Sequence, residues 1–119
     1  MCGIAGVLGK CTDEGKRSIL NRMIASLSHR GPDCHGIHIE SNMALGHARL
    51  SIIDIASGQQ PMTNDDQSVT ITFNGEIFNF IELRNELEAR GQRFRTRSDT
   101  EVILRLYETY GEDCVDHLN

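Results

Sequence analysis

The sequence predicts an α+β fold on the strength of three observations. Apolar residues recur at helical spacing in three segments, which begin near residues 13, 79 and 98. Shorter runs of alternating or continuous apolar residues, such as 2–8 and 69–73, predict strands. The predicted strands do not alternate regularly with the helices, and none is followed by a glycine-rich phosphate-binding motif. This order disfavours a parallel sheet built from βαβ units and a nucleotide-binding domain.

The first half of the chain is expected to hold one helix and three strands. Residues 2–8 predict a buried strand whose glycines allow close approach of another backbone. Residues 13–28 predict a helix, and a Gly-Pro loop at 29–33 precedes strands at 36–39 and 44–53. The predicted apolar face of the helix consists of Ile19, Leu20, Met23, Ile24 and Leu27.

A loop, a strand and a second helix are expected next. Residues 56–67 are rich in turn-forming residues and predict a loop, while 69–73 alternate as a half-buried strand does. The second helix is expected to begin at Asn79 as its cap, with Glu82 as the capping-box partner. Gly91 is expected to end it.

The last part of the chain predicts a short strand and a third helix. Phe94 is assigned to the strand, and the helix is expected to begin near Ser98 with Glu101 three residues on. Gly111 is expected to end this helix. Its predicted buried face consists of Val102, Ile103, Leu106, Tyr107 and Tyr110.

Chain length and net charge disfavour several classes of function. A chain of 119 residues is the size of one domain, residues 1–119, and can bury a core without disulfides or metal. Lys and Arg number 12 against 17 Asp and Glu, and the net charge of −5 disfavours a nucleic-acid partner. No apolar run approaches the ~20 residues of a membrane span, and no signal peptide is visible. We therefore expect a cytoplasmic protein with no membrane contact.

The four cysteines allow a metal or disulfide interpretation, which we weigh as an alternative. A disulfide framework needs an oxidising compartment, and no two cysteines show the C-x-x-C spacing. A metal site would combine the cluster at residues 34–38 with Cys11 or His29, but structural zinc sites usually show two tight ligand pairs. We expect no metal, and we expect the cysteines other than Cys2 to be buried or half-buried.

Cys2 is a candidate nucleophile because of its position. If Met1 is removed, Cys2 carries a free α-amine beside its thiol. The usual pKa of an α-amine, about 7.7–8.0, lies close to that of a thiol, about 8.5, so the amine can accept the thiol proton. One residue then supplies both nucleophile and base. The alternative is an inert cysteine that follows the initiator methionine by chance.

Several blocks along the whole chain add to this observation. The blocks are residues 1–6, 29–33, 48–54, 58–61, 73–79 and 98–104, with Gly36 between the second and third. Any one block is a weak match, whereas six in the expected order are specific. Through these blocks the sequence resembles the class II glutamine amidotransferase domain, an N-terminal-nucleophile hydrolase, and is most similar to the glutaminase domain of glutamine-dependent asparagine synthetases.

The resemblance implies a fold and partners. It implies part of a four-layer αββα sandwich, incomplete at its C-terminus, with residues 1–119 as the N-terminal portion of a type-2 glutamine amidotransferase domain. The synthetase domain would be absent. The implied partners are L-glutamine and a synthetase domain or subunit that accepts ammonia, and homo-oligomer formation is left open. No cofactor is implied in this domain, because ATP and magnesium would belong to the synthetase domain.

The resemblance also implies a reaction. Glutamine would be hydrolysed to glutamate and ammonia through a thioester on Cys2. The side-chain amide of Asn74 and the backbone N–H of Gly75 would bind the oxyanion of the tetrahedral intermediate. From these two residues alone, Asn74-Gly75 indicates a hairpin turn, although the capped helix predicted after it weakens that interpretation. A second hypothesis is an inactive or regulatory glutamine-binding fragment without catalysis.

The same resemblance implies residues that hold the substrate. Arg49 would bind the α-carboxylate of glutamine as a bidentate guanidinium pair. Asp99, assisted by Glu76, would bind the α-ammonium group. Judged alone, Arg49 is equally a surface arginine, and Asp99 a first-turn helix carboxylate. The implied substrate-binding residues are Arg49, Leu50, Ile52, Asn74, Glu76 and Asp99.

Overall fold

The computed structural model describes residues 1–50 and 58–119, and the chain divides into two compact units. Unit 1 comprises Met1–Ile52, Gln59–Pro61 and Thr72–Gly75. Unit 2 comprises Ile53–Gly58, Met62–Ile71 and Glu76–Asn119. Helices and antiparallel strands occur together, which confirms the α+β class. Among the described residues, every helix is too short or too polar to cross a membrane.

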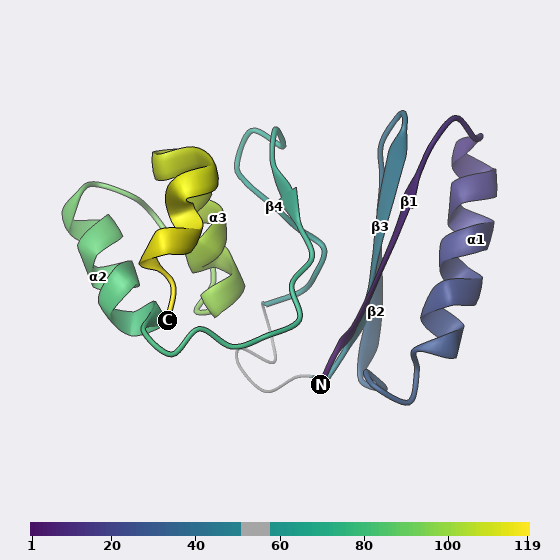
Figure 1. Ribbon diagram of the computed structural model, residues 1–119, viewed down its shortest axis with the longest axis horizontal. Coiled ribbons are helices and arrows are strands. Elements are labelled where there is room, and N and C mark those ends of the chain that lie inside the picture. Colours follow the sequence, from purple (N-terminus) through teal and green to yellow (C-terminus); the bar gives the residue numbers. More distant parts are fainter. Residues whose placement is uncertain (51–57) are drawn as a thin grey trace. The chain divides into compact units, whose positions relative to one another are not determined.

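Unit 1 is built on a three-stranded antiparallel sheet. The strands β1 (Gly3–Leu8), β2 (Cys34–Ile39) and β3 (Met43–Arg49) lie in the order β1-β3-β2. Helix α1 (Asp13–Ser26) packs against one face of this sheet (Figure 1). The core between them is formed by Ala5, Leu20 and Ala44, with Val7, Leu27, Ile37 and Ile39 packed around it.

The face that β3 turns towards α1 follows from its glycine. A Cβ atom on Gly46 would lie 2.7 Å from Cδ1 of Ile24 in α1. Successive side chains of a strand point to opposite faces, so Ala44 and Ala48 share this face with Gly46. His47 and Arg49 therefore point to the other face of the sheet.

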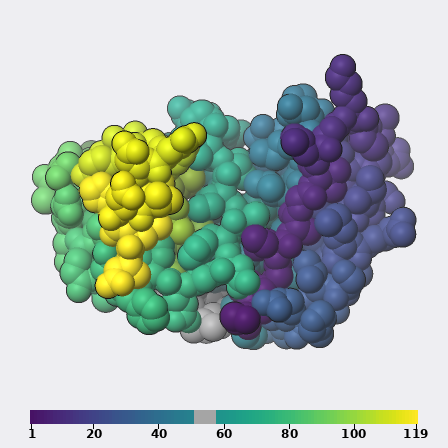
Figure 2. Space-filling model, in the orientation of Figure 1, coloured from purple at the N-terminus to yellow at the C-terminus, as the bar shows by residue number. Residues whose placement is uncertain are grey.

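The predicted burial in the first half of the chain was too extensive. The strand β1 alternates between buried and exposed residues, with Ile4 and Leu8 exposed, because α1 covers one face only. The purple residues of β1 are visible along the surface in Figure 2. The apolar face of α1 is also narrower than predicted, since Ile19 and Met23 are exposed.

A buried lysine secures α1 to the turn between β2 and β3. Lys16 is fully buried, and its ammonium group donates hydrogen bonds to the carbonyl oxygens of Glu40 and Ser41. It also pairs with Asp13 at 2.9 Å. A buried ammonium is tolerated only when its donors are satisfied, which these contacts achieve. Thr12 caps the start of the helix, because its hydroxyl accepts a hydrogen bond from the N–H of Gly15.

Unit 2 is mainly helical. Helix α2 (Phe80–Ala89) packs against α3 (Asp99–Tyr110), which continues into the short helix η1 (Gly111–His117). The hairpin of β4 (Met62–Thr63) and β5 (Thr70–Ile71) contacts α3. The C-terminus returns to the start of α2 (Figure 1), where the carbonyl of Asn119 accepts from the N–H of Phe78. The buried apolar residues are Met62, Ile77, Leu83, Leu87, Val102, Ile103, Leu104, Leu106 and Cys114.

Three strand predictions were wrong in extent or existence. The loop predicted at 56–67 contains β4 in its described part, and the strand predicted at 69–73 shortens to β5. The strand predicted at 44–53 ends as β3 at Arg49, and its residues 51–53 lie outside the described residues. Phe94 is not in a strand. The N–H of the next residue, Arg95, donates to a carboxylate instead of to a neighbouring strand.

The helix ends were predicted well, but one predicted cap differs. Gly91 and Gly111 end α2 and α3 with φ of 94° and 61°, which glycine adopts readily. The side chain of Asn79 does not cap α2, because its amide donates to the carbonyl of His117. Ser98 caps α3 through the N–H of Thr100, as predicted. The predicted buried face of α3 is corrected at Tyr107, which is 41% exposed.

Candidate active site

The sulfur of Cys2 lies against the backbone of Leu50. The N–H of Leu50 donates to Sγ at 3.2 Å, and the thiol donates to the carbonyl of Leu50 at 3.4 Å. Cys2 is half-buried. These two contacts fix the position of the sulfur. Leu50, which we predicted as a substrate-binding residue, thus contacts the candidate nucleophile through its main chain.

Arg49 ends β3 at the same end of the sheet. Gly3 pairs with Ala48, so the register continued by one residue places Cys2 across from Arg49. Residues directly opposite each other in an antiparallel pair point to the same face. Arg49 is 5% exposed, and its carbonyl accepts a hydrogen bond from the N–H of Asp33 at 3.0 Å. Cys2 and Arg49 therefore occupy opposite positions in the continued strand register of unit 1.

Arg30 attaches the Cys2 backbone to the loop after α1. Its Nε donates to the carbonyl oxygen of Cys2 at 3.0 Å. Close packing fixes this loop as well, because a Cβ on Gly31 would lie 2.1 Å from the carbonyl oxygen of Ala48. The position of Cys2 is thus fixed at its sulfur by the backbone of Leu50 and at its carbonyl oxygen by Arg30.

The predicted oxyanion donors lie in unit 1 as well, in the segment Thr72–Gly75. Asn74 and Gly75 are both exposed. A Cβ on Gly75 would lie 2.6 Å from the ring of Phe73, so the segment folds compactly on itself. The hairpin alternative for Asn74-Gly75 is wrong, because β5 ends at Ile71 and α2 is the next regular element.

The residues predicted for the α-ammonium group lie in unit 2. Asp99 is the first residue of α3 and is 5% exposed. Its Oδ2 accepts a hydrogen bond from the N–H of Ile77 at 3.2 Å, and Glu76, which is exposed, directly precedes Ile77. The contact connects the start of α3 to the chain next to Glu76. Ile52, the remaining predicted substrate-binding residue, lies outside the described residues.

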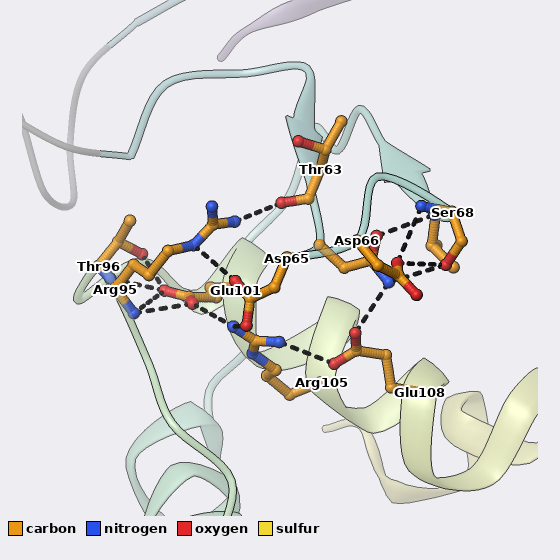
Figure 3. Close-up of polar contacts among 11 residues, drawn as sticks. Thr63, Asp65, Asp66, Ser68, Arg95, Thr96, Glu101, Arg105 and Glu108 are labelled. Carbon is orange, nitrogen blue, oxygen red and sulfur yellow. Dashed lines mark hydrogen bonds and ion pairs between the residues drawn. The ribbon is translucent and has the colours of Figure 1, made fainter.

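A buried carboxylate fixes the turn that leads into α3 (Figure 3). Glu101 is fully buried and accepts hydrogen bonds from the N–H groups of Arg95 and Thr96 and from the Thr96 hydroxyl. The Thr96 hydroxyl in turn accepts from the N–H of Ser98, the cap of α3. The capping-box role predicted for Glu101 is therefore wrong, because its carboxylate binds residues 95 and 96 instead.

Arg105 connects α3 to the β4–β5 hairpin through the same network. It is 3% exposed and pairs with Glu101, Glu108 and Asp65, the last at 3.1 Å (Figure 3). Asp65 also pairs with Arg95 at 3.2 Å. These contacts attach the hairpin to the turn before α3. They explain why α3 is buried on nearly all sides from Asp99 to Leu106 despite its charged residues.

His47 is the most strongly perturbed histidine of unit 1. It is fully buried, and its Nδ1 lies 2.9 Å from the Thr72 hydroxyl, whereas Nε2 has no hydrogen-bond partner among the residues described. Burial, followed by the nearby charge of Arg49, lowers the pKa of His47 to about 4. His47 is therefore neutral at physiological pH.

We expect this neutral state to be visible in titrations. The Hε1 resonance of His47 should stay constant from pH 8 to about pH 5.5 and move only near the lowered pKa. Since the unfolded chain binds the proton more readily, stability should fall as the pH drops from about 6.5 towards 4. Exposed His35 serves as the control. A His47 midpoint near 6.5 would contradict the burial of its ring.

The other cysteines are free thiols in the structure. Burial, with the charges of Asp113 and Asp116, raises the pKa of Cys114 and disfavours its thiolate. Cys11 is exposed, which corrects the prediction that it is buried or half-buried. Among the described residues, His, Cys, Asp and Glu side chains do not gather in a group of three or more that could hold a metal ion.

The described site is an α+β domain in which a half-buried thiol at the second residue lies opposite a buried arginine in the continued strand register. The comparisons with known proteins are more specific. A family model described as a glutamine amidotransferase domain matches residues 1–119, and the chain belongs to this family.

Named relatives agree with the family model. The chain is 49% identical to glutamine-hydrolysing asparagine synthetase 2 of Lotus japonicus and 48% identical to asparagine synthetase 2 of Oryza sativa subsp. japonica. It is 47% identical to asparagine synthetase 3 of Arabidopsis thaliana. Each match covers 100% of this chain and 20% of the relative, so the chain spans about a fifth of the length of the curated relatives it matches.

Sequence reasoning missed the side chains that hold the candidate site in place. The sequence indicated only a structural or loop role for His47, and nothing in it pointed to Thr72 as its partner. The pair Glu101 and Arg105, four residues apart on a predicted helix, is a pattern that indicates an ion pair. No pattern in the sequence indicated that the pair of Glu101 and Arg105 is buried.

Proposed function

We propose that this chain hydrolyses the side-chain amide of L-glutamine to glutamate and ammonia, with Cys2 as the nucleophile. The observation that carries the proposal is the position of the Cys2 sulfur, 3.2 Å from the N–H of Leu50 and next to Arg49 in the sheet register. Membership of the glutamine amidotransferase family supports glutamine as the substrate. Cys2, Leu50 and Arg49 all lie in unit 1.

The reaction begins with a proton transfer within Cys2. Once Met1 is removed, the α-amine takes the thiol proton, and the thiolate forms a bond to the δ-carbon of glutamine. The contact with the Leu50 carbonyl is lost with the thiol proton, while the Leu50 N–H continues to stabilise the sulfur. The carbonyl oxygen of glutamine becomes an oxyanion. Its proposed donors are the Asn74 amide and the Gly75 N–H, each worth about 3–4 kcal/mol.

Ammonia leaves in the second half of the reaction. The carbon–nitrogen bond breaks, the leaving nitrogen takes the proton from the α-ammonium group of Cys2, and a thioester remains. Water, deprotonated by the same α-amine, attacks the thioester and releases glutamate and the thiol. One amine thus acts as base and acid in turn, which is why the proposal assigns no catalytic histidine.

Substrate recognition is proposed from the zwitterionic form of glutamine. Arg49 binds the α-carboxylate, because a guanidinium offers two parallel donors to a carboxylate. Asp99 and Glu76 bind the α-ammonium group, and Leu50 and Ile52 complete the substrate-binding set. Both carboxylate oxygens of Asp99 accept a hydrogen bond, Oδ2 from the N–H of Ile77 and Oδ1 from the Ser98 hydroxyl, so the carboxylate is held in a fixed orientation.

The proposal also includes the fate of the ammonia and the larger fold to which unit 1 belongs. The relatives are glutamine-hydrolysing asparagine synthetases, so we propose that the ammonia passes to a synthetase domain or subunit. ATP and magnesium belong to that partner and not to this domain. We further propose that the sheet and α1 of unit 1 are layers of a four-layer αββα sandwich.

The test is glutaminase activity of the 119-residue chain. With L-glutamine as the substrate, glutamate and ammonia should appear in equal amounts and follow saturation kinetics. L-asparagine, one methylene shorter, is the matched control substrate and should react far more slowly. Saturable glutamine binding without glutamate release would reject catalysis and favour the regulatory alternative. The absence of both binding and release would reject the site itself.

A further inference from the structure

Two side chains hold the backbone just before Asn74. His47 Nδ1 lies 2.9 Å from the Thr72 hydroxyl, and the side-chain oxygen of Gln60 accepts a hydrogen bond from the N–H of Phe73 at 2.6 Å. Both contacts lie within unit 1. They fix two successive residues immediately before the candidate oxyanion donors.

The first of these two contacts is made by a rigidly held side chain, that of His47. His47 lies in the middle of β3, with Ile4 of β1 opposite it on one side and Gly36 of β2 on the other. It is fully buried, so its ring has little freedom to move. The pKa of about 4 keeps the ring neutral. A neutral imidazole nitrogen can share one proton with a hydroxyl without placing a charge beside Arg49.

The anchor at Gln60 is packed on the same face of the sheet. A Cβ on Gly36 would lie 1.9 Å from the carbonyl oxygen of Gln60, so the two backbones are in direct contact. Gly36 pairs with His47, and the two residues therefore share a face. The strand β3 thus supports Thr72 directly through His47, and β2 packs against Gln60, which supports Phe73.

The position of Thr72 determines the positions of Asn74 and Gly75, because the segment that contains them is short and compactly folded. Only Phe73 separates Thr72 from Asn74, and its ring lies against Gly75, where a Cβ would be 2.6 Å away. A shift of Thr72 must therefore move Asn74 and Gly75. Oxyanion donors lose most of their effect when misplaced, since an error of about 1 Å can cost about 100-fold in rate.

We propose that His47 is a positioning residue, which holds Asn74 and Gly75 in place through the Thr72 hydroxyl. This inference rests on the proposed function, because it assigns the support of the oxyanion donors in that reaction. It gives a role to a buried histidine that the reaction itself does not use.

The test compares isosteric changes at Thr72. Thr72→Val keeps the shape and removes the hydroxyl, and kcat for glutamine hydrolysis should fall about 10- to 100-fold. KM should change less than about threefold, because the bond to the Thr72 hydroxyl acts on the transition state and not on substrate binding. Thr72→Ser keeps the hydroxyl and should retain most of kcat. In the double variant Thr72→Val with His47→Leu, kcat should be no lower than in the single His47→Leu variant.

A second readout does not depend on activity. The backbone amide resonances of Asn74 and Gly75 should move in Thr72→Val and stay in place in Thr72→Ser. The controls are Thr109→Val, an exposed threonine of unit 2, and His35→Gln, an exposed histidine of β2. Both should leave kcat unchanged.

The outcomes separate this inference from the proposed function. An active wild type whose Thr72→Val variant keeps its kcat overturns the positioning role alone, as does a rise in KM equal to the fall in kcat. An inactive wild type overturns the proposed function. In that case, unmoved amides of Asn74 and Gly75 in Thr72→Val overturn the contact as well.

Discussion

Replacing Cys2 by Ala should lower kcat for glutamine hydrolysis by at least about 10⁴-fold. The reason is that the proposed reaction passes through a covalent bond to this sulfur, and no second thiol lies in an equivalent environment among the residues described. The Cys2 sulfur is half-buried and receives the Leu50 N–H, whereas Cys114 is buried and its thiol pKa is raised. Substrate binding should survive, since Arg49 and Asp99 are unchanged.

The measurement is steady-state glutamate production, with glutamine binding measured separately by calorimetry. Cys11→Ala and Cys34→Ala are matched controls, because each removes one thiol that the proposal does not use. Both should retain wild-type kcat. A Cys2→Ala variant that still produces glutamate at a tenth of the wild-type rate or more would exclude the thioester. Loss of activity in Cys34→Ala to the same degree would also contradict the assignment.

Replacing Glu101 by Ala should lower the free energy of unfolding by about 3–5 kcal/mol. Glu101 is fully buried and serves two partners at once, the ion pair with Arg105 and the backbone N–H groups of Arg95 and Thr96. Its removal leaves a buried guanidinium with weaker compensation and two N–H groups without their acceptor. Because the turn at 95–98 leads to Asp99, the KM for glutamine should also rise.

The control for Glu101 is another i,i+4 pair whose members are exposed. Glu86 pairs with Arg90 at 2.7 Å on the surface of α2, and Glu86→Ala should cost about 0–1 kcal/mol. Glu101→Gln keeps one acceptor oxygen and should fall between the two. Urea denaturation followed by circular dichroism gives all three values. If Glu101→Ala and Glu86→Ala cost the same, the buried network of Figure 3 contributes no more than a surface pair.

Local patterns predicted the helices well and the short strands poorly. Helix α1 and the ends at Gly91 and Gly111 follow from periodicity and glycine, which act over a few residues. The strand at Phe94 was wrong because Glu101, seven residues further on, takes the backbone donors of the next residues. The cap at Asn79 was wrong because residues 117–119 use its side chain. Both errors arise from contacts that a local window does not contain.

For the candidate site, too, the sequence indicated some residues and not others. Cys2, Arg49 and Asn74 were predicted as site residues because they lie in blocks that are recognisable in the sequence, and their roles stay predictions. Their support was missed, because the bond from His47 to Thr72 joins residues 25 positions apart and the burial of His47 depends on both neighbouring strands. A histidine on an inner strand face is a weak signal on its own. The structure supplies the partner that makes it specific.

The most direct test of the account is the intact mass of the purified chain after reaction with an electrophilic analogue of glutamine. The account predicts a starting mass lower by one methionine residue, and one adduct that peptide mapping places on Cys2. Excess L-glutamine should protect against labelling, and Cys2→Ala should take up no label. A chain that keeps Met1 and stays unlabelled, or one that is labelled equally in Cys2→Ala, would contradict the central claim.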